Sequence, residues 1–411
     1  FVLYILQLNM KLKSIFIRKR RKNESLFKYI SAIIHLWLGL VSSVVVMIVC
    51  ITGCIYAFKN EINNYFNRSH LYVKVEKQAL PIDFFENKFK ENNLEIASIT
   101  LPNNSKRSIV ISSIDPNTQL IQTNYFNPYT GEELNYNKTK DLSKFFRTIE
   151  NLHKNLLLGE IGKQIVGAFV IIFIICLLSG LILWWPKRNK KQIKQAFTIK
   201  WKSKFYRVNY DLHNTIGFYS LIFLLFISIT GIYITYPWVK NAVLISLGGQ
   251  SISQQTQLPE DGVSDSFAAL MDEMIKKEEE IDKKETENTI SLSEILKISN
   301  QILPYNGTTS ITLPNENEAW IRIQKTNTNN WLGMILTDYI DLDRKGNLKK
   351  SELFKDKPLH QQFQELSKPL HTGEIMGTSS VVFYFIITFI GFTLPITGFI
   401  IWWKKARRAI Q

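Results

Sequence analysis

Long apolar stretches alternate with polar segments along this chain. Crossing the hydrocarbon core of a bilayer requires about 20 helical residues. Four stretches are long and apolar enough, at residues 31–58, 156–185, 212–236 and 380–403. The pattern therefore predicts an α-helical membrane protein with four transmembrane helices and folded segments outside the membrane.

The two long polar segments show the same order of elements: one helix-like pattern, three strand-like runs and a turn. In the first segment these are residues 81–92, then 95–101, 107–113 and 119–126, with the turn at 127–131. In the second they are residues 291–303, then 308–313, 319–325 and 334–341, with the turn at 343–346. We therefore expect two small α+β domains, with the Glu- and Lys-rich stretch 271–288 as a solvated helix or linker.

The net charge of +15 is unevenly distributed. Residues 1–30, 186–209 and 404–411 hold 21 of the 50 Lys and Arg residues, and Glu24 is their only acidic residue. Positive charge beside short loops marks the cytoplasmic face of a membrane. This distribution predicts cytoplasmic termini and contact with the lipid bilayer, and it argues against nucleic acid as a partner.

The predicted layout alternates between the two sides of the membrane. It comprises a basic N-terminus (1–30), a span (31–58), an outer domain (59–152), a span (153–185), a basic cytoplasmic loop (186–209), a span (210–236), a second outer domain (237–370), a span (371–403) and a tail (404–411). Residues 1–9 precede Met10 and are expected to be an upstream extension of the reading frame. The three cysteines lie within spans, so we expect no disulfides in the outer domains.

Matching residues recur in the two halves of the chain. The first His of each half has Gly four and eighteen residues later, and the second His precedes a Trp pair by thirty-one residues. These positions are His35, Gly39, Thr52-Gly53, His153 and Trp184-Trp185 in the first half, and His213, Gly217, Thr230-Gly231, His371 and Trp402-Trp403 in the second. Both halves enter the membrane in the same direction, which predicts a parallel 2+2 repeat about an axis along the membrane normal.

The predicted topology decides which histidines can meet. His35 and His213 lie near the starts of spans that leave the cytoplasm, whereas His153 and His371 precede spans that return. The predicted pairs are therefore His35 with His213 and His153 with His371. Ionisable groups in spans are costly and usually functional, and axial imidazole is ordinary haem chemistry. We therefore expect two b-type haems, each bound non-covalently by two histidines, since the sequence has no CxxCH motif.

Small and cationic residues near the histidines are consistent with haem but also have simpler explanations. Gly39 and Gly217 are expected to clear space for a flat macrocycle, although small residues also let membrane helices pack closely. Haem propionates need cations or hydrogen-bond donors, whereas long cationic side chains near a membrane also extend to the interface. The candidates for the propionates are Arg147, Lys154, Lys368, Lys28 and Arg207.

Zinc or copper is the competing metal hypothesis. Each predicted pair offers two imidazoles, with Glu160 and Glu374 as further candidates at one pair and Asp211 at the other. His70 and His360 have no equivalents in the other half and are expected at the surface, although His360 could approach a haem or substrate. The two Trp pairs are expected to anchor the protein at the membrane interface, with electron flow as the alternative.

Several motifs resemble those of one known family. The runs Leu152-His153-Lys154-Asn155, Tyr210-Asp211-Leu212-His213-Asn214 and Pro369-Leu370-His371-Thr372-Gly373-Glu374, with the closing Trp-Trp pairs, resemble the PepSY-associated transmembrane family. The segment Asn127-Pro128-Tyr129-Thr130-Gly131-Glu132 resembles the hairpin of a PepSY domain. Within that family, the chain is most similar to periplasmic siderophore-iron (ferrioxamine-type) reductases.

The resemblance implies two PepSY-like periplasmic domains and transfer of electrons to a periplasmic acceptor, with a ferric siderophore as the favoured substrate. The sequence shows no convincing flavin or nicotinamide motif, so a quinol or a separate cytoplasmic reductase is the expected electron donor. Two other classes of function stay open. One is a PepSY-type binding or regulatory protein without redox activity, and the other is a permease.

Overall fold

The computed structural model describes residues 20–22, 24–76, 78–116, 118, 120–134, 142–186, 189–250, 290–314, 320–330 and 332–410. The predicted linker 271–288 and the extension 1–9 lie outside these residues. The chain divides into two compact units. The helical unit comprises residues 1–59, 143–240 and 366–411, and the sheet unit comprises residues 60–142 and 241–365.

Four helices of the helical unit are long and apolar enough to cross a membrane. They are α2 (Leu26–Ala57), α7 (Gly159–Trp184), the continuous helix Phe205–Thr235 and α16 (Thr378–Ile410). The third consists of α9 (Phe205–Asp211), a π-helical turn η2 (Leu212–Ile216) and α10 (Gly217–Thr235). Helix α2 packs against α7 and α16, and α7 also packs against α10. The prediction of a membrane protein with four apolar helices is confirmed.

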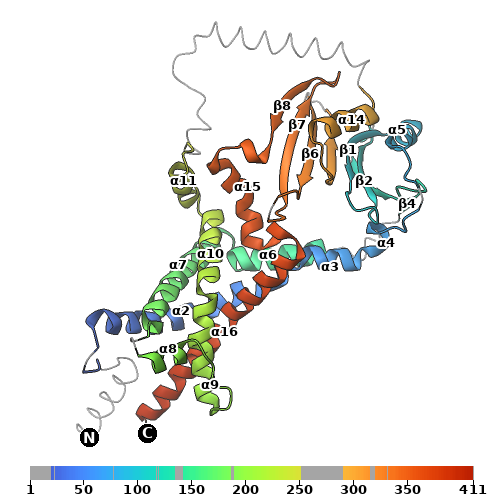
Figure 1. Cartoon of the computed structure of the whole chain (residues 1–411). Helices are drawn as coiled ribbons and strands as arrows, with labels where there is room; N and C mark the ends of the chain where they lie inside the picture. Colours follow the sequence, from blue (N-terminus) through green and yellow to red (C-terminus); the bar gives the residue numbers. More distant parts are fainter. Residues whose placement is uncertain are drawn as a thin grey trace. The chain divides into compact units, whose positions relative to one another are not determined.

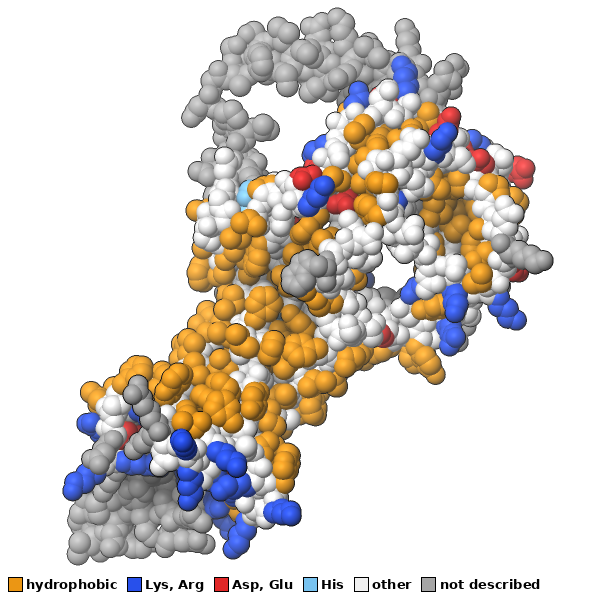
Figure 2. Space-filling model, in the orientation of Figure 1, with side chains coloured by type: hydrophobic (Ala, Val, Ile, Leu, Met, Phe, Trp, Pro, Cys, Tyr) orange, Lys and Arg blue, Asp and Glu red, His pale blue; other side chains and the backbone are white. Residues whose placement is uncertain are grey.

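The outer surface of these helices is apolar, as a bilayer requires. Large hydrophobic side chains such as Val44, Ile175, Ile222 and Phe399 are exposed. Figure 2 shows this continuous hydrophobic surface, with Lys and Arg gathered at one end of it, at the lower left of the view. Small polar residues such as Ser42, Thr52 and Thr230 are buried between the helices instead, since their short side chains allow close helix packing.

Two further helices of this part of the chain precede spans. Helix α6 (Ser143–Asn155) leads into α7, and α15 (Leu359–Thr372), followed by the short 3-10 helix η4 (Glu374–Met376), leads into α16. Both connections contain residues with positive φ, namely Leu156, Leu157 and Gly159 in the first, and Gly373 and Gly377 in the second. The sequence had assigned α6 to the first outer domain, but α6 belongs to the helical unit.

The sheet unit contains one antiparallel eight-stranded sheet in the order β4-β3-β2-β1-β5-β6-β7-β8. Its strands are β1 (Glu95–Leu101), β2 (Ile109–Ile114), β3 (Ile121–Phe126), β4 (Glu133–Leu134), β5 (Thr309–Thr312), β6 (Ile321–Asn327), β7 (Leu336–Leu342) and β8 (Leu348–Glu352). Its helices include α5 (Ile82–Glu91) and α14 (Leu292–Ile302). The other short elements among the described residues are α3 (Lys59–Phe66), α4 (Arg68–Leu71), α8 (Lys190–Ala196), α11 (Pro237–Ser246) and η3 (Phe354–Asp356) (Figure 1).

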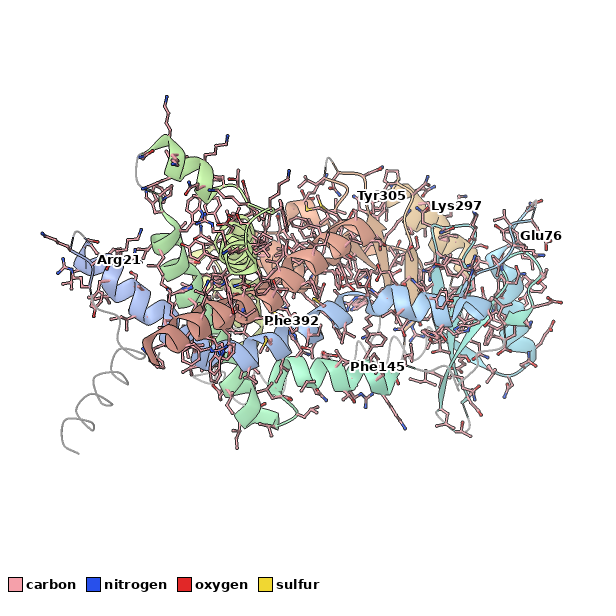
Figure 3. All side chains as sticks on the ribbon, turned by 90° about the horizontal axis from the view of Figure 1, so that it is seen from below. Arg21, Glu76, Phe145, Lys297, Tyr305 and Phe392 are labelled. Atoms are coloured by element: carbon pink, nitrogen blue, oxygen red, sulfur yellow. The ribbon has the colours of Figure 1, made fainter. Side chains whose placement is uncertain are left out.

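The two polar segments were expected to form two separate domains, but in the structure they share one sheet and one core. Strands β1 and β5 pair at the centre, with Ile99 opposite Ile311. Both of these side chains are fully buried, as are Phe85 on α5 and Ile295 on α14. The pairing of β1 with β5 joins the two four-stranded halves into one sheet. The helices of both halves then pack on the same apolar face of this sheet, and one shared core results. Figure 3 shows the side chains, with Phe145 on α6 and Tyr305 in the sheet unit labelled.

Candidate functional site

The four predicted ligand histidines meet in two pairs within the helical unit. His35 on α2 faces His213 in the π-helical turn η2, with ring centroids 6.2 Å apart and ring planes at 76°. His153 on α6 faces His371 on α15, with centroids 6.1 Å apart and planes at 63°. Both pairings are those expected from the topology.

The two pairs lie at opposite ends of α2. A Cβ atom on Gly53 of this helix would approach Cε1 of His153 to 3.2 Å, so His153 lies beside Gly53. His35 is eighteen residues earlier on α2. At 1.5 Å per helical residue, this separation corresponds to about 27 Å, comparable with the thickness of a hydrocarbon core of about 30 Å.

Three of the four histidines donate from Nδ1 to a main-chain carbonyl oxygen. The Nδ1 to oxygen distances are 2.9 Å from His35 to Cys176, 2.9 Å from His153 to Val49 and 3.1 Å from His371 to Ile227. The Nδ1 atom of His213 lies 2.9 Å from the hydroxyl oxygen of Thr397 instead. Because a carbonyl can only accept, Nδ1 of His35, His153 and His371 must carry the hydrogen, and Nε2 of these rings is left with its lone pair. Metal-bound histidines typically have this arrangement.

The spacing of the rings fits two imidazoles on opposite sides of one metal. A metal–nitrogen bond of about 2.0 Å and about 1.1 Å from nitrogen to ring centroid would place the two centroids about 6.2 Å apart. The observed spacings are 6.2 and 6.1 Å. The residues of both pairs therefore fit a group that is bound axially by two histidines.

A cavity of about 640 Å³ surrounds the His35/His213 pair. Cofactor sites usually have volumes of about 300–1,000 Å³. Gly39 and Gly217 line this cavity together with Gly180 and Gly398. A Cβ atom at Gly39 or Gly217 would come no closer than 3.4 Å to a neighbouring side chain, so packing between helices does not require glycine there. The cavity therefore has free space beside Gly39 and Gly217, where the sequence analysis predicts room for a flat macrocycle.

Cationic side chains line the same cavity near the ends of α2 and α16. Lys28, which the sequence proposed for a propionate, is one of them, and its Nζ atom also donates to the carbonyl oxygen of Trp185 at 3.4 Å. Arg21 and Lys405 also line the cavity but were not among the candidates. The sequence contained a signal for both, because Arg21 lies seven residues before Lys28 and Lys405 lies two residues after the Trp402-Trp403 pair.

The two predicted arginines lie elsewhere. Arg207 forms an ion pair with Asp211 at 3.0 Å, and the Asp211 side chain is almost completely buried. Arg207 is absent from the residues that line the cavity, and its guanidinium neutralises this buried carboxylate instead. Arg147 is exposed on α6, less than two turns before His153. The structure thus associates Arg207 with Asp211 and leaves Arg147 facing outward.

No third ligand accompanies either pair within the described part of the chain. The described residues contain no group of three or more His, Cys, Asp or Glu side chains placed to hold a metal ion. Cys50, Cys54 and Cys176 are free and buried. Zinc sites usually have three or four protein ligands, so the donor set favours a planar cofactor that supplies its own equatorial ligands.

The remaining histidines belong to the sheet unit. His70 was expected at the surface, but it is only 2 % exposed and its ring packs against Tyr125 at 4.5 Å between centroids. His360 lies beside Gly249, where a Cβ atom would approach the ring to 2.8 Å. The burial of His70 and its contact with Tyr125 identify it as a core residue.

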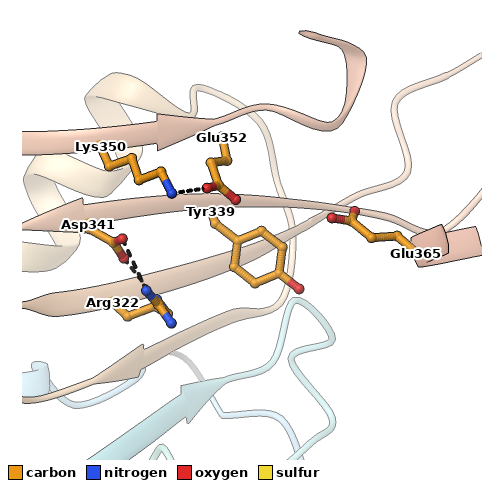
Figure 4. A pocket seen from close by; sticks show the side chains of 6 residues that line it. All are labelled: Arg322, Tyr339, Asp341, Lys350, Glu352 and Glu365. Atoms are coloured by element: carbon orange, nitrogen blue, oxygen red, sulfur yellow. Dashed lines mark hydrogen bonds and ion pairs between the residues drawn. The ribbon is translucent and has the colours of Figure 1, made fainter. Parts of the chain in front are cut away.

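A second cavity, of about 300 Å³, lies in the sheet unit beside β6, β7 and β8 (Figure 4). Arg322 binds Asp341 through two hydrogen bonds of 3.0 and 3.2 Å, and Lys350 pairs with Glu352. Tyr339 and Glu365 complete its lining. Because its cations have acidic partners, this cavity has no clear preference for a charged ligand.

The fold and the paired histidines define a class: a membrane protein with four apolar helices long enough to span a bilayer, a separate antiparallel sheet unit and two pairs of facing histidines. The sequence matches the model of the PepSY-associated TM region over residues 32–405. The chain therefore belongs to this family, and the resemblance seen in its motifs is confirmed. Among curated proteins, none matches the sequence. The closer resemblance to siderophore-iron reductases stays a prediction.

Proposed function

We propose that this protein is a di-haem b oxidoreductase of the bacterial inner membrane. The His35/His213 pair and the His153/His371 pair would each hold one haem. The main support is that both pairs have nearly the same ring spacing, 6.2 and 6.1 Å, and that Nδ1 of every imidazole contacts an oxygen atom of a spanning helix: a carbonyl oxygen for His35, His153 and His371, and the Thr397 hydroxyl for His213. A histidine with a purely structural role would need neither a second imidazole at this distance nor an Nε2 atom that keeps its lone pair.

The direction of electron flow follows from the predicted topology. The basic segments favour a cytoplasmic position for the His35/His213 pair, where a quinol or a cytoplasmic reductase would donate electrons. The His153/His371 pair would then serve a periplasmic acceptor. When bound, haem supplies one-electron redox chemistry, and the protein needs no acid–base residue for that step.

The favoured acceptor is a ferric siderophore. Its oxygen ligands hold Fe(III) more tightly than Fe(II), so the gain of one electron weakens the complex and releases iron for acquisition. This choice rests on the resemblance to siderophore-iron reductases, whereas the two-site arrangement rests on the histidines themselves.

The chain's own residues would bind and orient the two cofactors. Lys28, Arg21 and Lys405 line the cavity of the His35/His213 pair and would neutralise the carboxylates of a haem there. Arg147 remains a candidate for the other pair because of its place on α6. The apolar lining would exclude water, which limits side reactions.

The first experiment is a reduced-minus-oxidised absorption spectrum with haem quantification on detergent-purified full-length protein. We expect low-spin b-type bands and about two haems per chain, as two bis-histidine sites require. Protein that contains no haem, even after reconstitution, would contradict the proposal and favour a PepSY-type binding or regulatory role. Reduction of a ferric siderophore by the loaded protein would then identify the acceptor.

A further inference from the structure

Each of the four spanning helices contains one Ser/Thr-Gly dipeptide, and each dipeptide contacts one of the four histidines. The contacts are Ser179-Gly180 with His35, Thr52-Gly53 with His153, Thr397-Gly398 with His213 and Thr230-Gly231 with His371. We call each dipeptide, with the carbonyl four residues before its glycine, a histidine seat.

The glycine of each seat lies against Cε1 of the imidazole. A Cβ atom would approach Cε1 to 3.1 Å at Gly180, 3.2 Å at Gly53, 3.2 Å at Gly398 and 3.0 Å at Gly231. Carbon atoms in ordinary contact are about 3.5–4.0 Å apart. Any other residue would push the ring away, so glycine lets the imidazole lie directly on the backbone of the neighbouring helix.

The hydroxyl of each seat is already committed as a donor. The Ser179 hydroxyl donates to the seat's own carbonyl over 3.0 Å. Each threonine hydroxyl donates within its own helix, either to the seat's carbonyl (3.0 Å at Thr52, 3.0 Å at Thr397 and 2.9 Å at Thr230) or to the carbonyl one residue earlier (2.7, 3.1 and 3.1 Å, respectively). The oxygen of each hydroxyl therefore accepts from the imidazole. The distances from Nδ1 to the hydroxyl oxygen are 3.1 Å for His35, 3.2 Å for His153, 2.9 Å for His213 and 3.0 Å for His371.

The Nδ1–H of His35, His153 and His371 thus faces two acceptors, a carbonyl oxygen and a hydroxyl oxygen, and the Nδ1–H of His213 faces the Thr397 hydroxyl oxygen. These acceptors fix the hydrogen on Nδ1 and leave Nε2 available. Acceptors of this kind also raise the basicity of a metal-bound imidazole and orient its ring. A more basic axial ligand stabilises the oxidised metal, and hydrogen bonding around the ligands is one of the means by which a protein sets the reduction potential.

We propose that the four Ser/Thr-Gly seats are positioning elements that fix the tautomer and direction of each axial histidine and lower the reduction potential of its haem. This inference rests on the proposed function. Every seat lies in the same half of the chain as its histidine, so each half orients its own two ligands. Each haem would then be bound by one histidine from each half of the chain, and each of these rings would already be oriented by a seat of its own half.

The test removes one hydroxyl at a time in the full-length protein. Thr397→Val should raise one of the two midpoint potentials in a redox titration followed by haem absorption and leave the other unchanged. Thr52→Val should raise the other one. The conservative variant Thr52→Ser keeps the acceptor and should restore the original potential, which a role in packing alone would not produce.

The matched control is Thr393→Val, one turn before Thr397 on α16. The Thr393 hydroxyl donates to the Ile390 carbonyl at 2.8 Å, within its own helix. This variant should leave both potentials unchanged. Potentials that do not respond to Thr397→Val and Thr52→Val, or that shift equally in the control, would overturn the proposal.

A second measurement separates this inference from the proposed function. In protein prepared without haem and labelled with ¹⁵N-histidine, NMR should show the Nδ1–H tautomer for four imidazoles, and Thr230→Val together with Gly231→Ala should perturb one of them. If these four imidazoles carry the hydrogen on Nε2, the proposed role of the seats is wrong, even if the protein binds haem. If they carry it on Nδ1 but the protein binds no haem, only the proposed function is wrong.

Discussion

The His35/His213 pair and the His153/His371 pair have nearly the same ring spacing but are carried by different backbone. His35 lies in a regular α-helix, and His213 lies in the π-helical turn η2. His153 and His371 lie in the last turns of separate helices that end before the spans begin. The ring spacing is nearly the same although the four histidines lie on different backbone segments. The seats and the facing ring, rather than the helix that contains the histidine, therefore set the position of each imidazole.

Removing one ligand should give the largest effect and separate the two pairs. We expect His371→Ala to lower the haem content from about two to about one per chain, because iron held by two imidazoles would lose one of them. His213→Ala should remove the other haem. Quantification of haem and the spectrum of the remaining site provide the measurement. Loss of both haems from correctly folded His371→Ala protein would show that the two sites depend on each other.

Crowding one seat should weaken one site without removing it. In Gly231→Ala the new Cβ atom would lie 3.0 Å from Cε1 of His371. Changes around a metal ligand typically cost 10–100-fold in affinity, so we expect about that loss of haem affinity at one site, measured by transfer to a competing apoprotein. Gly391→Ala is the control, because its Cβ would crowd Leu224 at 3.0 Å and no imidazole. Equal haem loss in both variants would contradict a specific role for the seat.

The turn after His371 depends on glycine. Gly373 has φ +82°, and a Cβ atom there would lie 2.6 Å from Cγ of Tyr384. The left-handed conformation alone costs a non-glycine residue about 1–2 kcal/mol, so Gly373→Ala should destabilise the protein by about 2 kcal/mol. Thermal unfolding in detergent, followed by tryptophan fluorescence, measures this loss. An unchanged midpoint would show that the turn relaxes without cost.

The equivalent turn after His153 should respond in the opposite direction and more weakly. Leu157 has φ +62° and is 55 % exposed. Leu157→Gly should relieve about 1 kcal/mol of backbone strain, offset in part by the entropy of the more flexible unfolded chain. A small rise in the unfolding midpoint with an unchanged haem spectrum is expected. A clear fall would indicate that the Leu157 side chain contributes contacts, for example to lipid.

The positions of most elements could be predicted from the sequence. Hydropathy located the four spans because apolar length is a local property, and alternation located β1 and β5 to within about two residues. The single sheet could not be predicted in this way. Thr100 on β1 contacts Ser310 on β5 through their hydroxyls at 2.7 Å, across 210 residues of chain, and no local pattern specifies such a distant partner.

The histidine pairs of the candidate site could be predicted from the sequence, but the residues that orient the imidazoles could not. Spacing and predicted topology were sufficient to pair His35 with His213. Gly53 and Gly231 were recognised only by their spacing from the first histidine of each half, and the structure shows that they contact the second histidine, His153 and His371 respectively. Ser179-Gly180 and Thr397-Gly398 were missed, since each dipeptide serves a histidine on another helix. Counting Ser/Thr-Gly dipeptides within the spans would have revealed all four.

The central pairing of β1 with β5 has a consequence for a chain cut in two. Ile99 and Ile311 face each other across antiparallel strands, and β1 expressed without β5 would be an unpaired edge strand with an apolar face, which promotes association. The half-length polypeptide would also carry both of its oriented imidazoles and neither of their partners. A second copy would offer an antiparallel partner for the strand edge, and the helices of that copy would offer the second ring of each histidine pair.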